Sequence, residues 1–405
     1  MRTSNYIKYL LAYVTIASVF ACKSDDSDIS DYIYQLENET YPEIKHDRSQ
    51  LDPNIPETGV ATEDMVENVE TRYTININFT DDDAIVTGNS SAARIDKDGA
   101  HIRIANTRSG IKYILSGTSH NGSITIFGDK KFIMEFKDLS LKNPNGPAIN
   151  NQCKKTCFVV LADDTENRLE DGVDYPIEEN GIQSKGAFFS EGQTIFSGNG
   201  KLDVYGHNKH GIACDDYVRI RKGADIYVNV YKHQNVSASG IKANDGIYLN
   251  GGIVNVEINS DGGKGTNSED SIKIYGGRLT VLTYGAPLID TNTNDTTSSA
   301  GIKCNMAYVQ YGGDVAIHSN GNGTKGLNSN GNIIINQGSL NVVTLGQNNI
   351  SSPKGIKTDG DMTVSGGYIC SYSKKAAPLD VAGTLNYGAA SFIQSETKKS
   401  VTIKF

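Results

Sequence analysis

The chain has 405 residues, of which 42 are glycine, 21 are tyrosine and none is tryptophan, and its formal net charge is −9. This charge argues against nucleic acid as a partner, because binding to phosphates needs a basic surface. The abundance of glycine and small polar residues favours short β-strands joined by tight turns, and no long amphipathic helix is evident.

The N-terminus has the pattern of a secretion signal. Arg2 and Lys8 precede an apolar run from Tyr9 to Ala21 that is too short to span a membrane. The stretch VFAC, which ends at Cys22, resembles a bacterial lipobox, and the acidic residues after it resemble the export signal of bacterial surface lipoproteins. We therefore expect residues 1–21 to be a lipoprotein signal peptide and Cys22 to be lipidated. The mature protein would be anchored in the outer membrane and exposed at the cell surface, with a periplasm-facing lipoprotein as the alternative.

Residues 22–72 form an acidic segment with Pro42, Pro53 and Pro56 and no sustained apolar period. This composition predicts a flexible linker between the anchor and a folded domain at 73–405.

Five cysteines remain besides Cys22, and an odd number cannot be fully paired. Cys153 and Cys157 are candidates for a local disulfide in an oxidising compartment. The other three fall at positions expected for small core residues, namely Cys214, Cys304 and Cys370. No CxxC pair or histidine cluster indicates a zinc site.

A short phrase of glycine, an aliphatic residue, lysine and an acid recurs along the chain, as in KGIKTDGD from Lys354 to Asp361. The phrase glycines follow one another at steps of 25, 29, 25, 36, 25 and 29 residues, and they are Gly186, Gly211, Gly240, Gly265, Gly301, Gly326 and Gly355. Another glycine stands twelve residues after each of the last six. A period of this length indicates a solenoid.

Apolar residues alternate between these glycines, which is typical of strands with one buried face. In the coil from Gly240 we expect the inward residues to be Ile241, Ile247, Leu249, Val254, Val256 and Ile258. About three short strands fit in each coil, which predicts an all-β parallel β-helix with coils about 4.8 Å apart. A solenoid of strands and helices is the competing fold, but no segment has a 3.6-residue period long enough for a helix. Residues 73–150 lack the glycine spacing and would form the first, less regular coils.

Strand alternation places the second and fourth residues after each phrase glycine on the outside. The second-place residues are Ala213, Lys242, Asn267, Lys303, Asn328 and Lys357. The fourth-place residues are Asp215, Asn244, Glu269, Asn305, Asn330 and Asp359, and three of them are followed directly by Asp216, Asp245 and Asp270. Three further lysines precede phrase glycines: Lys264, Lys325 and Lys354. The sequence therefore predicts columns of lysine and of acid or amide along one edge, where the insertions between coils also gather.

Stacked carboxylate and amide oxygens suit a hard cation such as calcium. The candidate ligands are Asp215, Asp216, Asn244, Asp245, Glu269, Asp270, Asn305, Asn330 and Asp359. Two alternatives stay open: lysine and acid pair across the columns as a solvated ladder, or asparagine stacking alone stabilises the solenoid.

Four segments resemble a known family: KGIKTDGD, GIKANDGIYLNGG, FVVLADDTENRLEDG from Phe158 and KGAFFSEGQTIFSGNGKLDV from Lys185. They are similar to the calcium-associated, polygalacturonate-binding β-helix family described as carbohydrate-binding domain-containing protein. The resemblance extends from about Tyr73 to Phe405 and implies a right-handed parallel β-helix, bound calcium and recognition of acidic plant polysaccharide. Where the family most often has aspartate at the fourth place, this chain has Asn244, Asn305 and Asn330, and fewer charged ligands would weaken calcium binding.

We therefore expect non-catalytic, calcium-dependent binding of a polygalacturonate or pectin-type polysaccharide by a monomer. The candidate ligand-binding residues are Lys242, Lys264, Lys303, Lys325, Lys354 and Lys357. One alternative is a pectate-lyase-like elimination, although no single base stands out. Another is a surface adhesin or structural protein without a glycan ligand.

Overall fold

The computed structural model describes residues 46–175, 184–233, 236–289 and 294–405. The chain divides into two units, Met1–Asp47 and Arg48–Phe405, and every strand described belongs to the second unit. The predicted signal peptide and Cys22 lie outside the described residues. Within the described ranges, no helix has the length and hydrophobicity needed to cross a membrane.

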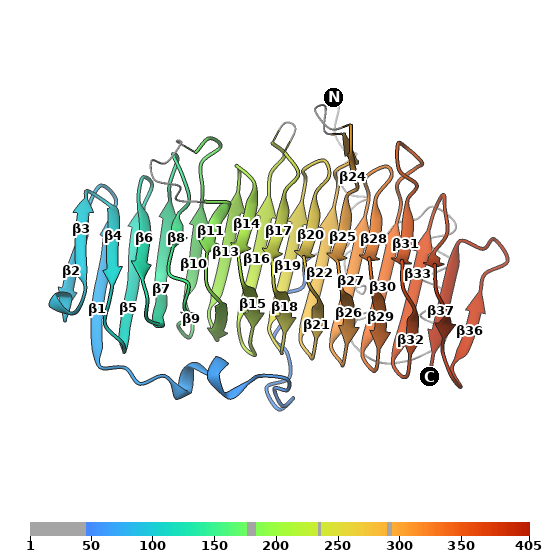
Figure 1. Ribbon diagram of the computed structural model, residues 1–405, viewed down its shortest axis with the longest axis horizontal. Helices are drawn as coiled ribbons and strands as arrows, with labels where there is room; N and C mark the ends of the chain where they lie inside the picture. The colour runs from blue at the N-terminus through green and yellow to red at the C-terminus, as the bar shows by residue number, and fades with distance from the viewer. Residues whose placement is uncertain (1–45, 176–183, 234–235, 290–293) are drawn as a thin grey trace, which may run out of the picture. The chain divides into compact units, whose positions relative to one another are not determined.

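The second unit is a parallel β-helix of about 11 turns, as the sequence predicts. Its coils lie side by side, and each regular coil contributes one strand to each of three stacks (Figure 1). The predicted number of strands per coil is therefore confirmed. No segment of the described chain between Tyr73 and Phe405 forms an α-helix, which removes the strand and helix solenoid as a competing fold.

The first stack contains the phrase strands and forms a sheet of its own in the described chain. It consists of β3 (Arg94–Asp98), β4 (His101–Asn106), β6 (Ser123–Gly128), β8 (Ile149–Asn151), β11 (Gly186–Ser190), β14 (His210–Cys214), β17 (Ser239–Ala243), β20 (Lys264–Ser268), β25 (Ala300–Cys304), β28 (Lys325–Ser329), β31 (Lys354–Thr358) and β34 (Leu379–Val381). Its strands are parallel except for the antiparallel pair β3 and β4.

The second stack follows the first around each coil. Its strands are β9 (Cys157–Leu161), β12 (Thr194–Gly198), β15 (Tyr217–Ile220), β18 (Gly246–Leu249), β21 (Ile272–Ile274), β26 (Ala307–Gln310), β29 (Asn332–Ile335), β32 (Met362–Val364) and β35 (Leu385–Asn386). The third stack completes the coil with β10 (Glu166–Glu170), β13 (Lys201–Gly206), β16 (Asp225–Val230), β19 (Ile253–Ile258), β22 (Arg278–Thr283), β27 (Asp314–Ser319), β30 (Ser339–Thr344) and β33 (Tyr368–Ser373).

The second and third stacks merge at the N-terminal end, because β7 (Phe132–Lys142) is long enough to pair with both β9 and β10. Before it come β1 (Tyr73–Thr80), β2 (Ala84–Gly88) and β5 (Ile111–Ser119), together with the 3₁₀ turn η3 (Ser90–Ala92). These are the less regular first coils that the sequence predicts. At the other end, β36 (Ser391–Gln394) and β37 (Ser400–Lys404) close the sheet, with β37 antiparallel to β33. A small hairpin of β23 (Leu288–Ile289) and β24 (Thr296–Thr297) lies in the insertion before β25.

The core runs along the inside of the coils and is built from the residues that alternation predicts. All six expected inward residues of the Gly240 coil are at most 3% exposed: Ile241, Ile247, Leu249, Val254, Val256 and Ile258. Each stacks in register on an inward residue of the next coil, as Val256 does on Val281. Binary pattern and coil register therefore agree throughout this region.

The phrase glycine is required by the approach of two strands within one coil. A Cβ atom on Gly265 would collide with Cγ1 of Val281, which points inward from the third stack of the same coil. The same conflict recurs between Gly211 and Val228, Gly240 and Val256, Gly301 and Ile317, and Gly326 and Val342. The glycine thus lets the first and third strands close the coil. The glycines twelve residues later have another reason, since Gly277 and Gly338 adopt the positive φ values of tight turns, 84° and 91°.

All five cysteines of the β-helix are free and buried, so the prediction of a local disulfide between Cys153 and Cys157 is wrong. Cys153 lies in a turn and directs its thiol to the carbonyl oxygen of Lys130 at 3.5 Å. Cys157 begins β9 and faces the core, where burial raises the pKa of its thiol well above the usual value. Cys214, Cys304 and Cys370 are core residues, as expected.

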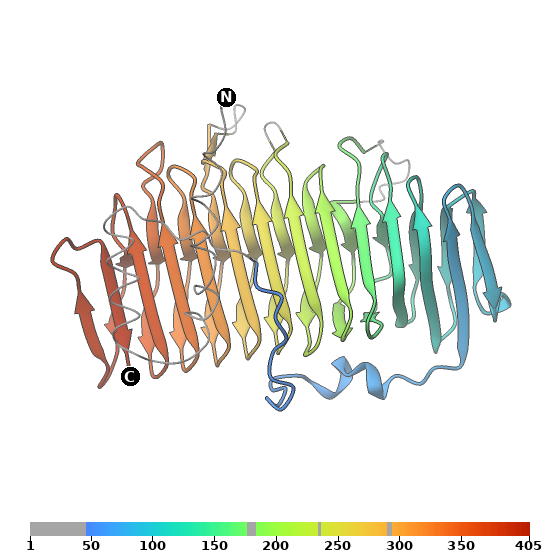
Figure 2. The ribbon, with the colours of Figure 1, turned by 180° about the vertical axis from the view of Figure 1, so that it is seen from behind.

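The segment before β1 packs on the coils from Arg48 onward, although its composition suggests a linker. It contains two 3₁₀ turns, η1 (Thr62–Asp64) and η2 (Val66–Asn68), and passes from the first coils to those in the middle of the solenoid (Figures 1 and 2). Val66 and Val69 cover a small apolar cluster of outward side chains, namely Ile133, Phe158 and Ile195. Outward apolar residues on the first coils thus give this segment a place to bind.

Replacing a phrase glycine tests the fit inside the coil. We expect Gly265→Ala to destabilise the β-helix by about 1–3 kcal/mol, because the new methyl group overpacks against Val281. The double variant Gly265→Ala/Val281→Ala should lose less stability than the sum of the single variants, since the second change makes room for the first. Urea unfolding followed by circular dichroism measures these differences. Strictly additive costs would show that the two positions do not contact each other.

Candidate functional site

The second-place residues align in register along the outside of the first stack. Lys242, Asn267, Lys303, Asn328 and Lys357 pair in turn between β17, β20, β25, β28 and β31. We call these five residues the lysine–asparagine column. Ala213 precedes them in register but is buried, because its methyl side chain lies between the larger Phe189 and Lys242. The column therefore places a cation on every second coil, about 10 Å apart at the usual strand spacing.

The fourth-place residues lie in the turns between the first and second stacks, where their side chains bond to one another. We call them and the three acids that follow them the acid–amide corner: Asp215, Asp216, Asn244, Asp245, Glu269, Asp270, Asn305, Asn330 and Asp359. Asn305 donates to Glu269 at 2.5 Å, and Asn330 donates to Asn305 at 3.0 Å. Asn244 donates to Asp215 at 3.4 Å. The structure thus brings the predicted column together as a ladder of amides and carboxylates.

The lysine–asparagine column and the acid–amide corner are joined by ion pairs. Lys242 pairs with Glu269 of the next coil, and Lys357 pairs with Asp359. Lys303 has no carboxylate within ion-pair distance among the described residues and donates instead to the Asn330 amide oxygen. The pairing that the sequence left as an alternative is therefore present in part. Glu269 and Asp359 stay about half exposed, with 53% and 51% of their side-chain surface open to solvent.

The lysines before the phrase glycines occupy a different place, at the start of the first strand beneath the insertions. Lys325 is 8% exposed, and its ammonium group donates to the hydroxyls of Ser298 at 3.0 Å and Ser351 at 2.8 Å. Lys264 donates to the Gly262 carbonyl oxygen at 2.7 Å and the Ser237 hydroxyl at 3.2 Å. Burial, followed by neighbouring lysines, lowers the pKa of each to about 8. Lys354 differs because it pairs with Asp380 at 3.0 Å.

The acid–amide corner fits calcium only in part. Its oxygens face solvent, but Glu269 already accepts from Lys242 and Asn305, and Asp215 from Lys185 at 2.7 Å. Burial, together with the nearby Asp245 carboxylate, raises the pKa of Asp216 above its ordinary value. The described ranges contain no cluster of three or more His, Cys, Asp or Glu side chains arranged to hold a metal ion. Calcium at this corner stays a prediction.

The structure adds charged residues that the phrase alignment did not single out. Lys185 precedes Gly186 as Lys264 precedes Gly265, and the shared KG dipeptide was the signal for it. Arg219 and Arg221 leave β15 on the outward face of the second stack. They carry no repeat signal, because the equivalent residues of the next coil are Tyr248 and Asn250.

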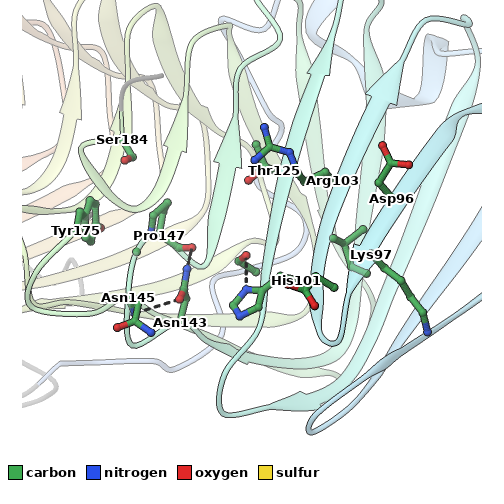
Figure 3. A pocket seen from close by; sticks show the side chains of 14 residues that line it. Asp96, Lys97, His101, Arg103, Thr125, Asn143, Asn145, Pro147, Tyr175 and Ser184 are labelled. Atoms are coloured by element: carbon green, nitrogen blue, oxygen red, sulfur yellow. Dashed lines mark hydrogen bonds between the residues drawn. The ribbon is translucent and has the colours of Figure 1, made fainter. Parts of the chain in front are cut away.

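A pocket of about 380 Å³ lies on the first coils, away from the predicted columns. His101, Arg103 and Thr125 line it from β4 and β6, and Asn143 and Pro147 line its opposite side (Figure 3). Inside it, His101 Nδ1 lies 2.9 Å from the Ser123 hydroxyl. None of the predicted site residues contributes to this pocket.

The chain belongs to the family described as carbohydrate-binding domain-containing protein. The family model matches residues 98–275 and again residues 239–395, so that the two matches together span most of the β-helix. The fold is thus a parallel β-solenoid, and the family match assigns a carbohydrate-binding domain to it. No curated protein matches the chain.

Among solved structures, one match is the polysaccharide lyase-like protein from C. thermocellum, solved as a gadolinium derivative. It aligns at 17% sequence identity with a TM-score of 0.47, over 77% of this chain and 96% of that chain.

The lowered pKa values of Lys264 and Lys325 predict that the free energy of unfolding depends on pH. The pKa of Lys325 is about 8 in the folded protein, whereas the ordinary value of 10.5 applies to the unfolded chain. Between about pH 8 and pH 10.5 the unfolded chain therefore binds more protons than the folded protein. Stability attributable to Lys325 should therefore rise as the pH increases from about 8 to 10.5. We expect Lys325→Met to be more stable than the parent protein at pH 7, with a difference that shrinks toward pH 10. Urea unfolding across this range measures it, and exposed Lys137→Met is the control. A difference that does not change with pH would contradict a recessed, charged lysine.

Proposed function

We propose that this protein binds an acidic polysaccharide of the polygalacturonate or pectin type along the outside of its first strand stack, without catalysis. The observation that carries this proposal is the lysine–asparagine column, which repeats a cation on every second coil. A straight column of this kind suits a long, extended polymer better than a compact ligand. The carbohydrate-binding family supports a glycan as the partner.

The spacing of the column favours a uronic acid polymer. A pyranose ring is about as long as the distance between coils, and successive carboxylates of an extended chain point to opposite sides. Every second carboxylate would then face the protein, as every second coil presents a lysine. The asparagines between them, Asn267 and Asn328, are partly buried and place amide groups between the lysines. Lys303 donates to the Asn330 amide oxygen and, unlike Lys242 and Lys357, has no carboxylate within ion-pair distance in the described chain.

The three lysines that precede phrase glycines, Lys264, Lys325 and Lys354, contribute positive charge beneath the insertions. Lys264 and Lys325 have no carboxylate within ion-pair distance in the described chain, and Lys354 is partly neutralised by Asp380. Their charges raise the local potential although the whole chain is acidic. The hydroxyls of Ser298 and Ser351 add hydrogen-bonding groups next to Lys325, beneath the insertions.

Calcium is part of the proposal. The solvent-exposed oxygens of Asp245, Asp270 and Asp359 would supply ligands, and the carboxylates of a bound uronate chain would supply the others. Because amides replace carboxylates at Asn244, Asn305 and Asn330, the protein alone would hold the ion weakly. The bound ion would neutralise repulsion between the acidic corner and the acidic sugar.

We propose that the protein acts as a monomeric lipoprotein anchored through Cys22 in the outer membrane and exposed at the cell surface. The lipobox and the acidic residues after it support this location.

A lyase-like activity is the second candidate, and the lowered pKa of Lys264 and Lys325 favours it. A lysine with a pKa of about 8 is partly neutral near physiological pH and can accept a proton. This base would remove the C5 proton next to the uronate carboxylate while the C4–O glycosidic bond breaks. A C4=C5 double bond then forms, and the leaving sugar oxygen takes a proton from water.

Substitution of the column lysines tests glycan binding. We expect Lys242→Ala/Lys303→Ala/Lys357→Ala to weaken binding to polygalacturonate about ten-fold or more, because each lost charge contributes up to about 1 kcal/mol. Affinity electrophoresis with calcium present measures this effect. The matched control is Lys131→Ala/Lys137→Ala/Lys375→Ala, which removes the same charge from exposed sites.

Three outcomes would contradict non-catalytic binding by this column. If the control variant lost as much affinity for polygalacturonate, binding would depend on the net charge of the protein and not on the column. Absorbance from an unsaturated product would favour the lyase instead. A folded protein that binds no glycan would favour a surface adhesin or structural role.

Calcium dependence can be tested at the asparagines. We expect a chelator to weaken polygalacturonate binding by the parent protein. We expect Asn244→Asp/Asn305→Asp/Asn330→Asp to bind calcium about ten-fold more tightly, since the variant restores charged ligands. Calorimetry with calcium, with and without galacturonate oligomers, measures both effects. Glycan affinity that is unchanged by chelation would remove calcium from the proposed function.

A further inference from the structure

The outward face of the second stack carries cations and tyrosines in one patch. We call it the tyrosine–arginine face, and its residues are Arg219, Arg221, Tyr248, Lys273, Tyr275 and Tyr311. The Arg219 guanidinium lies 4.7 Å from the centre of the Tyr248 ring. The rings of Tyr275 and Tyr311 stack with centres 4.8 Å apart and planes at 11°. The acid–amide corner separates this face from the lysine–asparagine column.

The first part of this face is covered by the chain's own N-terminal segment. Residues 49–69 include five acidic residues and no lysine or arginine. Three of these acids contact the arginines: Asp64 pairs with Arg219 at 2.9 Å, and Glu57 and Glu67 pair with Arg221 at 2.8 and 2.7 Å. Both arginine side chains are left 8% exposed. An acidic polymer thus already occupies part of the face.

The backbone of this segment also packs on the aromatic part of the face. Gly59 lies against the Tyr275 ring so closely that a side chain there would overlap the ring. Its carbonyl oxygen accepts from Arg219 at 2.9 Å. On this face, a backbone without a side chain packs on a tyrosine ring, and carboxylates pair with the arginines. The same alternation is offered by a chain of uronic acids, in which the C–H face of a sugar can stack on tyrosine.

The face continues beyond the covered part. Tyr311 is 44% exposed, and Lys273 is partly exposed with no acid within ion-pair distance in the described chain. Lys273 also lies 5.8 Å from the Tyr248 ring, so that its charge adjoins the covered arginines. An aromatic ring and a cation are thus open to solvent next to the segment.

We propose that the tyrosine–arginine face is a second binding site for a linear acidic polysaccharide, and that residues 49–69 occupy its first part when no ligand is bound. The open part, with Lys273 and Tyr311, makes the first contact. A longer chain then displaces the acidic segment from Arg219 and Arg221, whose positive charges become available to uronate carboxylates. This site is independent of the function proposed for the lysine–asparagine column.

Release of the segment tests this proposal by a gain in affinity, which a damaged fold would not produce. We expect Glu57→Gln/Asp64→Asn/Glu67→Gln, made in the full chain, to bind polygalacturonate oligomers about five- to ten-fold more tightly in calorimetry at fixed salt. The matched control is Asp82→Asn/Asp164→Asn/Glu396→Gln, which removes the same charge from exposed sites. In the released variant, Tyr311→Ala should weaken binding about three-fold, because a stacking surface is lost.

A further combination separates the two sites. We expect the gain to persist when Lys242→Ala/Lys303→Ala/Lys357→Ala is added to the released variant, even if those lysines prove unimportant for binding. The proposal is overturned if the released variant gains no more than the control, or if the gain disappears with the column lysines. Equal binding of poly-glutamate would assign the face to acidic peptides and overturn the sugar assignment.

Discussion

The structure depends on one constraint: every coil must close within the same outline, so that each residue lies directly over its equivalent in the next coil. The phrase glycine is central to this closure. At Gly265 and four of its equivalents, the absence of a side chain lets the first strand approach an inward Val or Ile of the third strand. Where that fit repeats, the inward residues form one continuous core, and the outward residues are forced into columns.

Residues that are far apart in the sequence come together on the surface as the outward columns. Each coil contributes one residue to a column, and the register between β17 and β31 alternates lysine with asparagine. A chain with a net charge of −9 thereby presents a local line of cations next to a line of acids. The two lines neutralise each other only in part, because Lys303 lacks an acid partner in the described chain whereas Lys242 and Lys357 have one. In the function proposed above, Lys303 is the charge of this line that remains available to an acidic sugar chain.

Contacts between distant parts of the sequence add a second layer of charge pairing. Glu57 and Arg221 are 164 residues apart in sequence, yet they form two hydrogen bonds, and Asp64 meets both Tyr217 and Arg219. The acidic segment, whose composition predicts a linker, is thus held by arginines on the outside of the solenoid. Apolar contacts of Val66 and Val69 with outward residues of the first coils support the same attachment.

The sequence by itself determined the repeat, the strand pattern and the identity of the outer columns, because periodic glycines and alternating apolar residues encode local geometry at each coil. The inward set of the Gly240 coil and the solenoid class follow from that pattern alone, and both are confirmed. Only the tertiary structure decided which charges are paired, recessed or covered. Lys325 and Lys303 occupy similar phrases, but one lies beneath an insertion and the other on the outer face. Arg219 and Arg221 belong to no repeated motif, and the free thiols of Cys153 and Cys157 depend on side-chain direction. These features arise from contacts between residues far apart in sequence, and no local period records such contacts.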